Sequence, residues 1–264
     1  EIEKIFVEKI NIFGNNITQE NVIRNQLEID EGDPFNEILL KKSINNMKSL
    51  GFFKTVSYST KENSKDKTRI INLTVKEKPT GEIMAGAGFG TGGTTTTFGV
   101  KENNYLGKGI SVDSKLDLSE TSIKGKIAVN NKNFKNSDKS IYANIQALET
   151  NKLSEFGYKT NKTGISLGTN FEYYDDLNFG IGASSFYEKI ETDSSASTRQ
   201  KNQAGDYFDN FLTLTFDYDK RNQRFQTTEG FRNYLTTEIP IISETNTLSN
   251  TFITTKYIEY LDQN

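Results

Sequence analysis

The sequence predicts two parts: a small α+β domain with the element order β-α-α-β-β, followed by a long antiparallel β-sheet. Up to residue 77, apolar residues recur at helical spacing between strand-like ends, which indicates two helices beside a small sheet. From residue 82 onward, apolar and polar side chains alternate in segments that are separated by Gly, Asn, Asp and Ser. The change of period falls at the stretch KEKPTG, residues 76–81. We therefore expect one domain over residues 1–78 and another over residues 81–264.

The composition excludes several classes of function. Among the 264 residues there is no Cys and no His, which removes disulfides, thiolate metal sites and the commonest general base. A net charge of −3 does not favour nucleic-acid binding. We expect no catalytic residue, no cofactor and no metal, and hence no enzyme. Because a strand-like pattern starts at the first residue, we also expect the chain to be an internal piece of a longer protein.

The first domain is predicted to contain a strand, two helices and a hairpin, over residues 4–13, 18–27, 36–50, 52–60 and 69–77. Thr18 is a suitable N-cap for the first helix, and Gly51 stands where a C-cap glycine would end the second. Leu40, Ile44 and Met47 recur at i, i+4 and i+7, so one face of the second helix is apolar. This order gives two helices on a three-stranded sheet, with the strand at 69–77 in the middle.

Ten strand-like segments follow, starting near Glu82, Thr94, Ile110, Ser122, Ser140, Lys159, Asp176, Tyr207, Phe231 and Leu248. Leu212, Leu214 and Phe216 share one face of such a strand, and polar residues occupy the other face. No run approaches the roughly 18 apolar residues of a membrane-spanning helix. This does not exclude a membrane barrel, because half the side chains of each barrel strand face a polar lumen and keep its mean hydropathy low.

The number of strands and the lengths of their connections favour a membrane barrel. Ten strands without an interrupting helix are too many for a small soluble barrel. The connection at residues 174–175 is short, whereas that at 191–206 is long and polar, and bacterial outer-membrane barrels have short periplasmic turns and longer external loops. We therefore predict a partial antiparallel transmembrane β-barrel with loop 191–206 outside.

Three motifs suggest other chemistry but lack the context that it requires. Residues 88–93 spell G-x-G-x-x-G, yet a strand-like TTTTF follows where a dinucleotide site needs a helix. Residues 164–168 spell G-x-S-x-G, yet a nucleophile elbow needs a strand-to-helix turn and a His base. Asp217, Asp219 and Glu229 suggest calcium but lack the spacing of a known calcium loop. We interpret the three motifs as a hairpin turn, a strand and a solvated turn.

Several stretches carry a resemblance to a known family. Gly14-Asn15, Glu31-Gly32 and the run MKSLGFF at 47–53 resemble a POTRA domain, and VKEKPTG at 75–81 resembles the end of the last POTRA domain of the BamA family, just before its barrel. NNYLGKG at 103–109 and the segment 219–231 resemble two turns of that barrel. The resemblance implies a POTRA domain followed by about ten of sixteen barrel strands.

The resemblance also implies a function in the bacterial outer membrane, with the POTRA domain in the periplasm. Members of this family fold and insert β-barrel proteins without covalent chemistry or nucleotide. The implied partners are unfolded outer-membrane β-barrel proteins, periplasmic assembly lipoproteins and chaperones, and outer-membrane lipid, with no nucleic acid. The alternatives are a TamA-like factor, a POTRA-bearing secretion pore, a passive channel, or a barrel that anchors an enzyme domain.

Arg24 and Glu31 are the first candidate site. By the resemblance, they match an Arg and a Glu with which the family's last POTRA domain docks a periplasmic lipoprotein. The alternative is an ordinary surface pair of negligible energy.

The edge of the small sheet is the second candidate. The strand at 54–60 should lie at an edge, where an extended substrate segment can add by β-augmentation to Val56, Ser57, Tyr58 and Ser59. Val56 and Tyr58 should face the helices, which leaves backbone groups as the main attraction.

The first barrel strand is the third candidate, as a gate. Its small or flexible segment consists of Ala85, Gly86, Ala87, Gly88, Phe89 and Gly90. Because glycine weakens a strand and packs little, this edge should pair poorly with whichever strand closes the barrel. The equally weighted alternative is that these glycines only allow curvature.

Overall fold

The computed structural model describes residues 4–63, 67–90, 93–222, 227–244 and 247–259. The chain divides into two compact units, which we describe separately. The first unit contains Glu1–Gly81 together with Glu102–Ser111 and Lys135–Ser137, and the second contains the remainder. Within the described ranges, no helix has the length and apolar character needed to cross a membrane.

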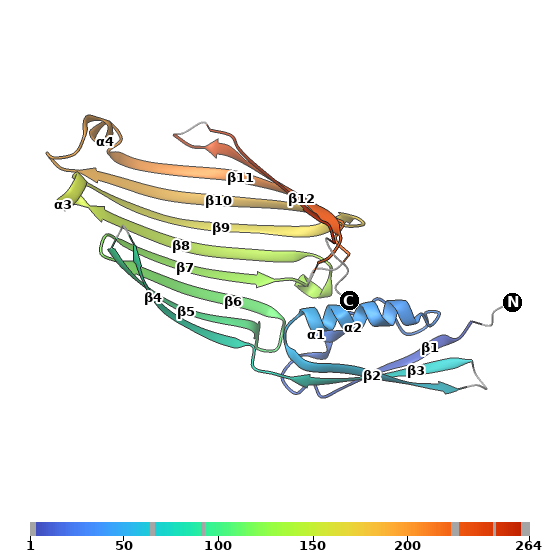
Figure 1. Cartoon of the computed structure of the whole chain (residues 1–264). Helices are drawn as coiled ribbons and strands as arrows, with labels where there is room; N and C mark the ends of the chain where they lie inside the picture. The colour runs from blue at the N-terminus through green and yellow to red at the C-terminus, as the bar shows by residue number, and fades with distance from the viewer. Residues whose placement is uncertain (1–3, 64–66, 91–92, 223–226, 245–246, 260–264) are drawn as a thin grey trace. The chain divides into compact units, whose positions relative to one another are not determined.

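The first unit has the predicted order β-α-α-β-β, with a three-stranded sheet and two helices (Figure 1). The elements are β1 (Phe6–Phe13), α1 (Glu20–Arg24), α2 (Glu37–Ser49), β2 (Phe53–Asn63) and β3 (Thr68–Glu77). The sheet order is β1-β3-β2, with β3 parallel to β1 and antiparallel to β2. The middle position of β3 is therefore confirmed.

The core of this unit forms from the apolar faces that the sequence pattern predicts. Leu40, Ile44 and Met47 of α2 are buried in one cluster with Ile71 and Leu73 of β3. Helix α2 begins after Asn36, whose side-chain oxygen accepts hydrogen bonds from two backbone N–H groups of the first turn. Gly51 follows the helix at φ +75°, the left-handed conformation that favours glycine at a helix end.

The prediction for the first helix of this unit is wrong. Helix α1 is shorter than predicted, and its N-cap is Gln19 rather than Thr18, without a side-chain cap. The reason is tertiary: the Thr18 hydroxyl accepts a hydrogen bond from Asn104 instead. Val56 is buried, and Tyr58, two residues further along β2 and hence on the same face, is 36% exposed.

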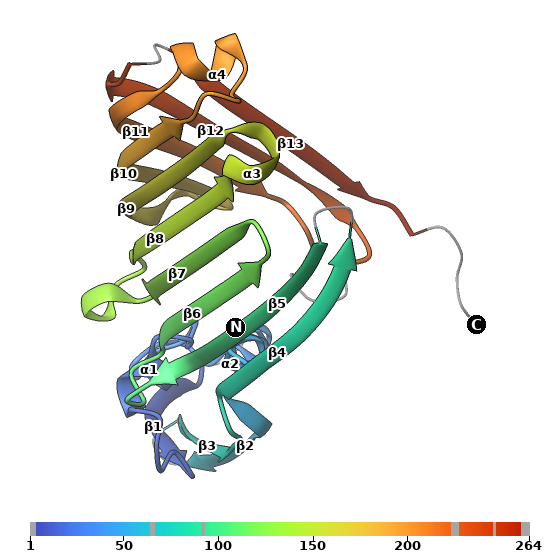
Figure 2. The same cartoon turned by 90° about the vertical axis from the view of Figure 1, so that its left-hand side faces the viewer.

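The second unit is built on a ten-stranded sheet in chain order, which Figures 1 and 2 show as a curved surface. Its strands are β4 (Gly81–Gly90), β5 (Gly93–Tyr105), β6 (Ile110–Ser119), β7 (Ser122–Asn131), β8 (Ser140–Lys152), β9 (Tyr158–Tyr174), β10 (Leu177–Thr192), β11 (Gly205–Asp219), β12 (Gly230–Ile242) and β13 (Ser249–Tyr257). Every predicted strand start lies within two residues of an observed one. The described strands leave β4 and β13 as the two edges, so the sheet is not closed.

The two faces of this sheet differ in polarity. On one face, Phe216 of β11 stands opposite Phe179 of β10, and their ring centroids are 5.1 Å apart. Ile181 and Ile165 are 42% and 46% exposed on the same face. A broad exposed apolar surface of this kind marks contact with a partner or with lipid. The opposite face carries polar residues such as Asp217.

The connections of the sheet contain three short helical turns that the sequence pattern did not predict: η1 (Phe134–Asn136), α3 (Leu153–Phe156) and α4 (Thr198–Asn202). Helix α4 lies in the long connection between β10 and β11 and begins with a capping box of Ser197 and Gln200. Gly157, at φ +71°, follows α3 and accepts a backbone hydrogen bond from Asp193 of that same long connection.

Candidate functional site

The outer edge of β2 presents unpaired backbone groups. In the described chain, β2 pairs with β3 alone, through matches such as Ser57 with Thr74 and Ser59 with Asn72. Ser57, Tyr58 and Ser59 are exposed, while Val56 anchors the strand in the core. A strand edge with free N–H and C=O groups can accept an extended polypeptide.

The other edge of the same sheet, along β1, is occupied by the chain itself. The Val7 N–H donates to Asp33 at 2.8 Å, and the Gly32 N–H donates to Val7 at 2.7 Å. The Ile10 N–H donates to Glu31 Oε1 at 2.9 Å. These contacts leave β2 as the edge that is open to a partner.

The structure brings Arg24 and Glu31 together at this closed edge. Arg24 Nη1 and Glu31 Oε1 are 3.7 Å apart, and Arg24 Nη2 donates to the Ile10 carbonyl at 3.1 Å. Arg24 also holds Glu20, with Nε and Oε1 2.7 Å apart. Both members of the pair keep more than a third of their side-chain surface exposed, so a partner can still reach them. The sequence pattern gives no sign that both side chains bond to Ile10.

Strand β4 forms one edge of the ten-stranded sheet, and all ten of its residues are exposed. A Cβ added at Gly86, Gly88 or Gly90 would meet no atom within 4 Å, and none of the three has a left-handed backbone. In the described chain, neither packing nor backbone conformation therefore requires glycine at these positions. The large apolar side chains of Ile83 and Phe89 are exposed at the same strand.

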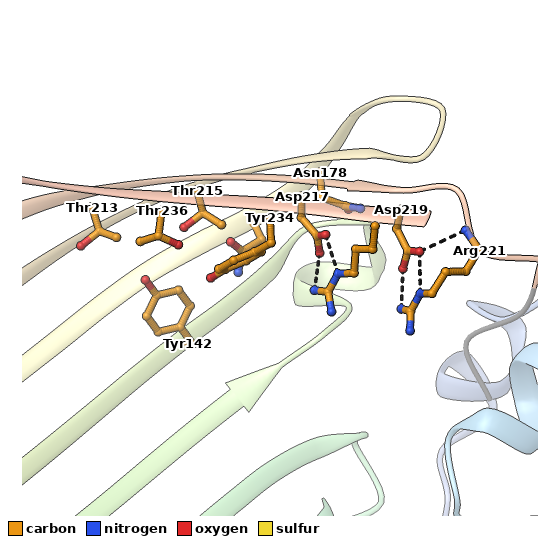
Figure 3. A pocket seen from close by; sticks show the side chains of 11 residues that line it. Tyr142, Asn178, Thr213, Thr215, Asp217, Asp219, Arg221, Tyr234 and Thr236 are labelled. Carbon is orange, nitrogen blue, oxygen red and sulfur yellow. Dashed lines mark hydrogen bonds and ion pairs between the residues drawn. The ribbon is translucent and has the colours of Figure 1, made fainter. Parts of the chain in front are cut away.

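A polar cavity of about 460 Å³ lies against the polar face of the sheet (Figure 3). Its lining residues come from β8 to β12 and from the turn after β11: Tyr142, Asn170, Asn178, Thr213, Thr215, Asp217, Asp219, Arg221, Arg232, Tyr234 and Thr236. Thr213, Thr215 and Tyr234 present hydroxyl groups to it.

Two ion pairs occupy one end of the cavity. Arg232 holds both oxygens of Asp217 at 2.7 Å, and Arg221 holds both oxygens of Asp219 at 2.7 and 2.6 Å. Because each carboxylate is engaged by a guanidinium, neither supports the calcium interpretation. In the ranges that the structure describes, no cluster of three or more metal-ligating residues is present.

The G-x-S-x-G motif has a packing explanation in β9. A Cβ added at Gly168 would lie 2.5 Å from the Tyr142 ring, and one at Gly182 would lie 2.4 Å from its hydroxyl oxygen. Likewise, a Cβ at Gly164 would lie 2.1 Å from the Phe186 ring. These glycines make room for two aromatic rings on the polar face of the sheet. Residues 91–92 of the other glycine motif lie outside the described residues, and β5 follows them.

Among the described residues, this geometry provides an open strand edge at β2, open edges at β4 and β13 of the ten-stranded sheet, and an apolar face. Backbone pairing with another strand is the interaction that such edges support. The polar cavity contains paired charges and hydroxyl groups without a His or Cys, so it offers no activated nucleophile of the usual kind.

Comparison with known families gives two matches. Residues 5–78 match the POTRA model, described as a surface antigen variable number repeat. Residues 104–264, more than half of the chain, match the Omp85 superfamily domain.

Curated relatives include outer membrane protein assembly factor BamA of Neisseria meningitidis, which is 27% identical over 188 residues. That alignment covers 68% of this chain and 24% of the relative. BamA of Buchnera aphidicola is 29% identical over 196 residues, which cover 68% of this chain and 30% of the relative. The chain thus spans less than a third of the length of these relatives.

Solved structures with a similar fold include BamA of Haemophilus ducreyi lacking POTRA domains 1–3. Its TM-score is 0.70 at 21% identity, and the match covers 91% of this chain and 49% of that one. CdiB of Acinetobacter baumannii matches with a TM-score of 0.54 at 9% identity, over 95% of this chain and 48% of that one. At these identities the likeness is one of fold.

Proposed function

The chain belongs to the Omp85 superfamily, and from this premise we propose that it is part of a factor that folds and inserts β-barrel proteins into the bacterial outer membrane. Its sheet is part of an outer-membrane β-barrel, and its POTRA domain lies in the periplasm. The proposed activity is non-covalent and uses no cofactor. The BamA relatives support it, and the observation that carries it is the glycine-rich edge strand β4, in which the described chain gives no packing reason for glycine.

The physical reason lies in the backbone of an unfolded substrate. Each unpaired N–H or C=O group costs several kcal/mol in lipid, so a strand cannot enter the membrane alone. An open edge such as β4 offers these groups partners by β-augmentation. Because the apolar face of the sheet contacts lipid, the β4 edge lies in the membrane, into which the substrate strand has to insert.

We infer that β4 acts as the gate, because nothing in the described chain requires its three glycines. A Cys replacing Ala87 and a second Cys in the strand that closes the barrel of the whole protein should lock the seam under oxidation. Growth and substrate insertion should stop when the lock forms and return on reduction. This chain contains no native Cys, so no disulfide within it competes.

The control for the lock is a Cys pair between β4 and its permanent neighbour β5, which should leave function unchanged. A barrel that works equally well with the seam locked would show that the glycines serve curvature alone. It would also favour a secretion pore, a passive channel or an anchor for an enzyme domain.

We further propose that the β2 edge receives extended segments of unfolded substrate. A photo-crosslinking residue at Tyr58 should capture such segments, because this side chain lies beside open backbone groups. The matched control is Phe6, which is exposed beside the closed edge of β1. Crosslinks that come equally from Phe6, or only from the helices, would contradict the proposal.

Arg24 and Glu31 are proposed to dock a periplasmic assembly lipoprotein. Reversing the charge of either residue should reduce co-purification of the lipoprotein while the POTRA domain stays folded by circular dichroism. The control is the exposed pair Glu37 and Lys41, whose charged atoms are 2.9 Å apart on α2. Unchanged co-purification after reversal at Arg24 and Glu31 would leave them as a structural pair at the β1 edge.

A further inference from the structure

Three segments that are distant in the sequence meet inside the first unit: the loop before α1, the linker after β3, and the turn between β5 and β6. The turn belongs to this unit by its contacts, as the segment Glu102–Ser111. Hydrogen bonds join the three segments at this meeting point.

The centre of the meeting point is a buried hydrogen bond. Asn104 Nδ2 donates to Thr18 Oγ1 at 2.9 Å, although 86 positions separate the two residues. Thr18 is 2% exposed and Asn104 is 4% exposed. The Asn104 side-chain oxygen also accepts from the Gly109 N–H at 2.7 Å. A buried polar group without a partner is costly, so both residues favour the joined state.

The backbone joins the loop and the turn a second time. The Gln19 N–H donates to the Gly107 carbonyl at 2.8 Å. Gly107 has φ +70°, and a Cβ at this position would lie 2.0 Å from the Ile17 carbonyl oxygen. The two backbones approach so closely that only glycine fits.

Two carboxylates extend the meeting point to the end of β3 and to the linker. Glu77 accepts hydrogen bonds from the N–H groups of Asn16, Ile17 and Thr18 at 2.9, 3.0 and 2.6 Å. Glu102 accepts from the Asn104 N–H at 2.7 Å and from the Thr80 hydroxyl.

These bonds close a ring that runs from the end of β3 through the loop and the turn to the linker. A linker of three residues, 78–80, would otherwise be free to bend. We propose that the turn between β5 and β6 is a structural part of the POTRA domain, and that this ring makes the domain and the base of the β5–β6 hairpin move as one body. The linker is then a fixed part of the first unit, together with the turn that it contacts.

The experiment measures whether the turn is fixed to the domain. Spin labels replace Lys41 on α2 and Lys108 in the turn, both exposed, in the whole protein reconstituted in nanodiscs. Double electron–electron resonance should give one narrow distance distribution. Thr18→Val and Asn104→Leu should each broaden it at least twofold. The control is Thr237→Val, which removes a hydroxyl that is bonded to Asn250 elsewhere in the sheet.

A broad distribution in the unmodified protein, or equal widths in all variants, would overturn the proposal. Hydrogen exchange gives a second test that needs no variant to fold. The Gln19 and Gly109 amides should exchange at least tenfold more slowly in the unmodified protein than the amide of Leu106, a residue of the same turn that is 67% exposed. Unprotected Gln19 and Gly109 amides would overturn the proposal as well.

Discussion

Ile71 and Leu73 of β3 are fully buried, whereas Ile165 and Ile181 of the ten-stranded sheet are nearly half exposed. The α+β unit gathers its apolar side chains between two layers and exposes its ion pairs, such as Glu37 with Lys41. The sheet does the reverse: its apolar side chains face outward, and Asp217 and Arg232 pair on the opposite face. The same residue types therefore occupy opposite positions because the surrounding medium changes from water to lipid.

The largest expected loss of stability comes from a substitution in the buried core of the α+β unit. Leu73→Ala removes a fully buried side chain between β3 and the helices, and should destabilise the POTRA domain by about 4 kcal/mol. Chemical denaturation followed by circular dichroism measures this loss. Replacement of exposed Thr55 in β2 by Ala is the control. If Leu73→Ala lowers the free energy of unfolding by no more than the control does, the buried cluster around Leu73 does not stabilise the domain.

A charged side chain on the apolar face of the ten-stranded sheet tests whether that face contacts lipid. Ile181→Lys should destabilise the membrane-inserted sheet by up to about 3 kcal/mol, because a lysine on the apolar, lipid-facing side of the sheet is poorly solvated. Thr213→Lys introduces the same side chain at a neighbouring position on the polar face and should be tolerated better. Folding titrations in lipid vesicles compare the two. Equal losses would contradict the assignment of faces.

The ion pair on the polar face should contribute less. Asp217→Ala leaves the Arg232 guanidinium without the carboxylate that it holds through two hydrogen bonds, and should cost about 2 kcal/mol. The double replacement of Asp217 and Arg232 by Ala should recover part of this loss. A double-mutant cycle in the same folding assay measures the coupling, and an additive result would exclude it.

The smallest effect is a pH dependence of the POTRA domain. Partial burial raises the pKa of the Glu77 carboxyl, but hydrogen bonds from Thr18 and from the Ile17 and Asn16 backbones outweigh it and hold the pKa below its usual range. The stabilisation is therefore complete above the unfolded pKa of about 4.3 and disappears as the pH falls through the lowered value.

Thermal unfolding between about pH 6 and pH 3 checks that the stability contributed by Glu77 decreases as the pH falls. Glu77→Gln should lose on the order of 1 kcal/mol at the upper end and show a weaker acid dependence than the unmodified domain. Parallel pH profiles for the two proteins would mean that other carboxyl groups account for the dependence.

The sequence predicted the strands well because lipid and lumen impose an alternation that is visible in several of them, such as β6 and β11. It predicted the central place of β3 from the element order alone. It could not predict that Thr18 bonds to Asn104, so the start of α1 was wrong. The two bonds from Arg24 and Glu31 to Ile10 span 14 and 21 positions and follow no periodic pattern. Their proposed docking role remains a prediction.

The G-x-S-x-G motif at 164–168 shows a second limit of prediction from sequence. Its spacing matched a catalytic motif, whereas Gly164 and Gly168 leave room for the rings of Phe186 and Tyr142. The positions of these rings depend on the register between β8, β9 and β10, which a single strand does not specify. The same holds for the connections that contain α3 and α4, which are joined by the hydrogen bond from the Asp193 N–H to the Gly157 carbonyl.

The bond between Thr18 and Asn104 also has a consequence for the order of folding. Ribosomal synthesis and export deliver Thr18 long before its partner, which follows 86 positions later. The sheet and helices of the α+β unit can form from local contacts, but the loop before α1 has to wait for the hairpin of β5 and β6. Closing so long a segment is slow compared with local helix and hairpin formation. The last step in the maturation of the periplasmic domain is thereby linked to the first steps of barrel formation.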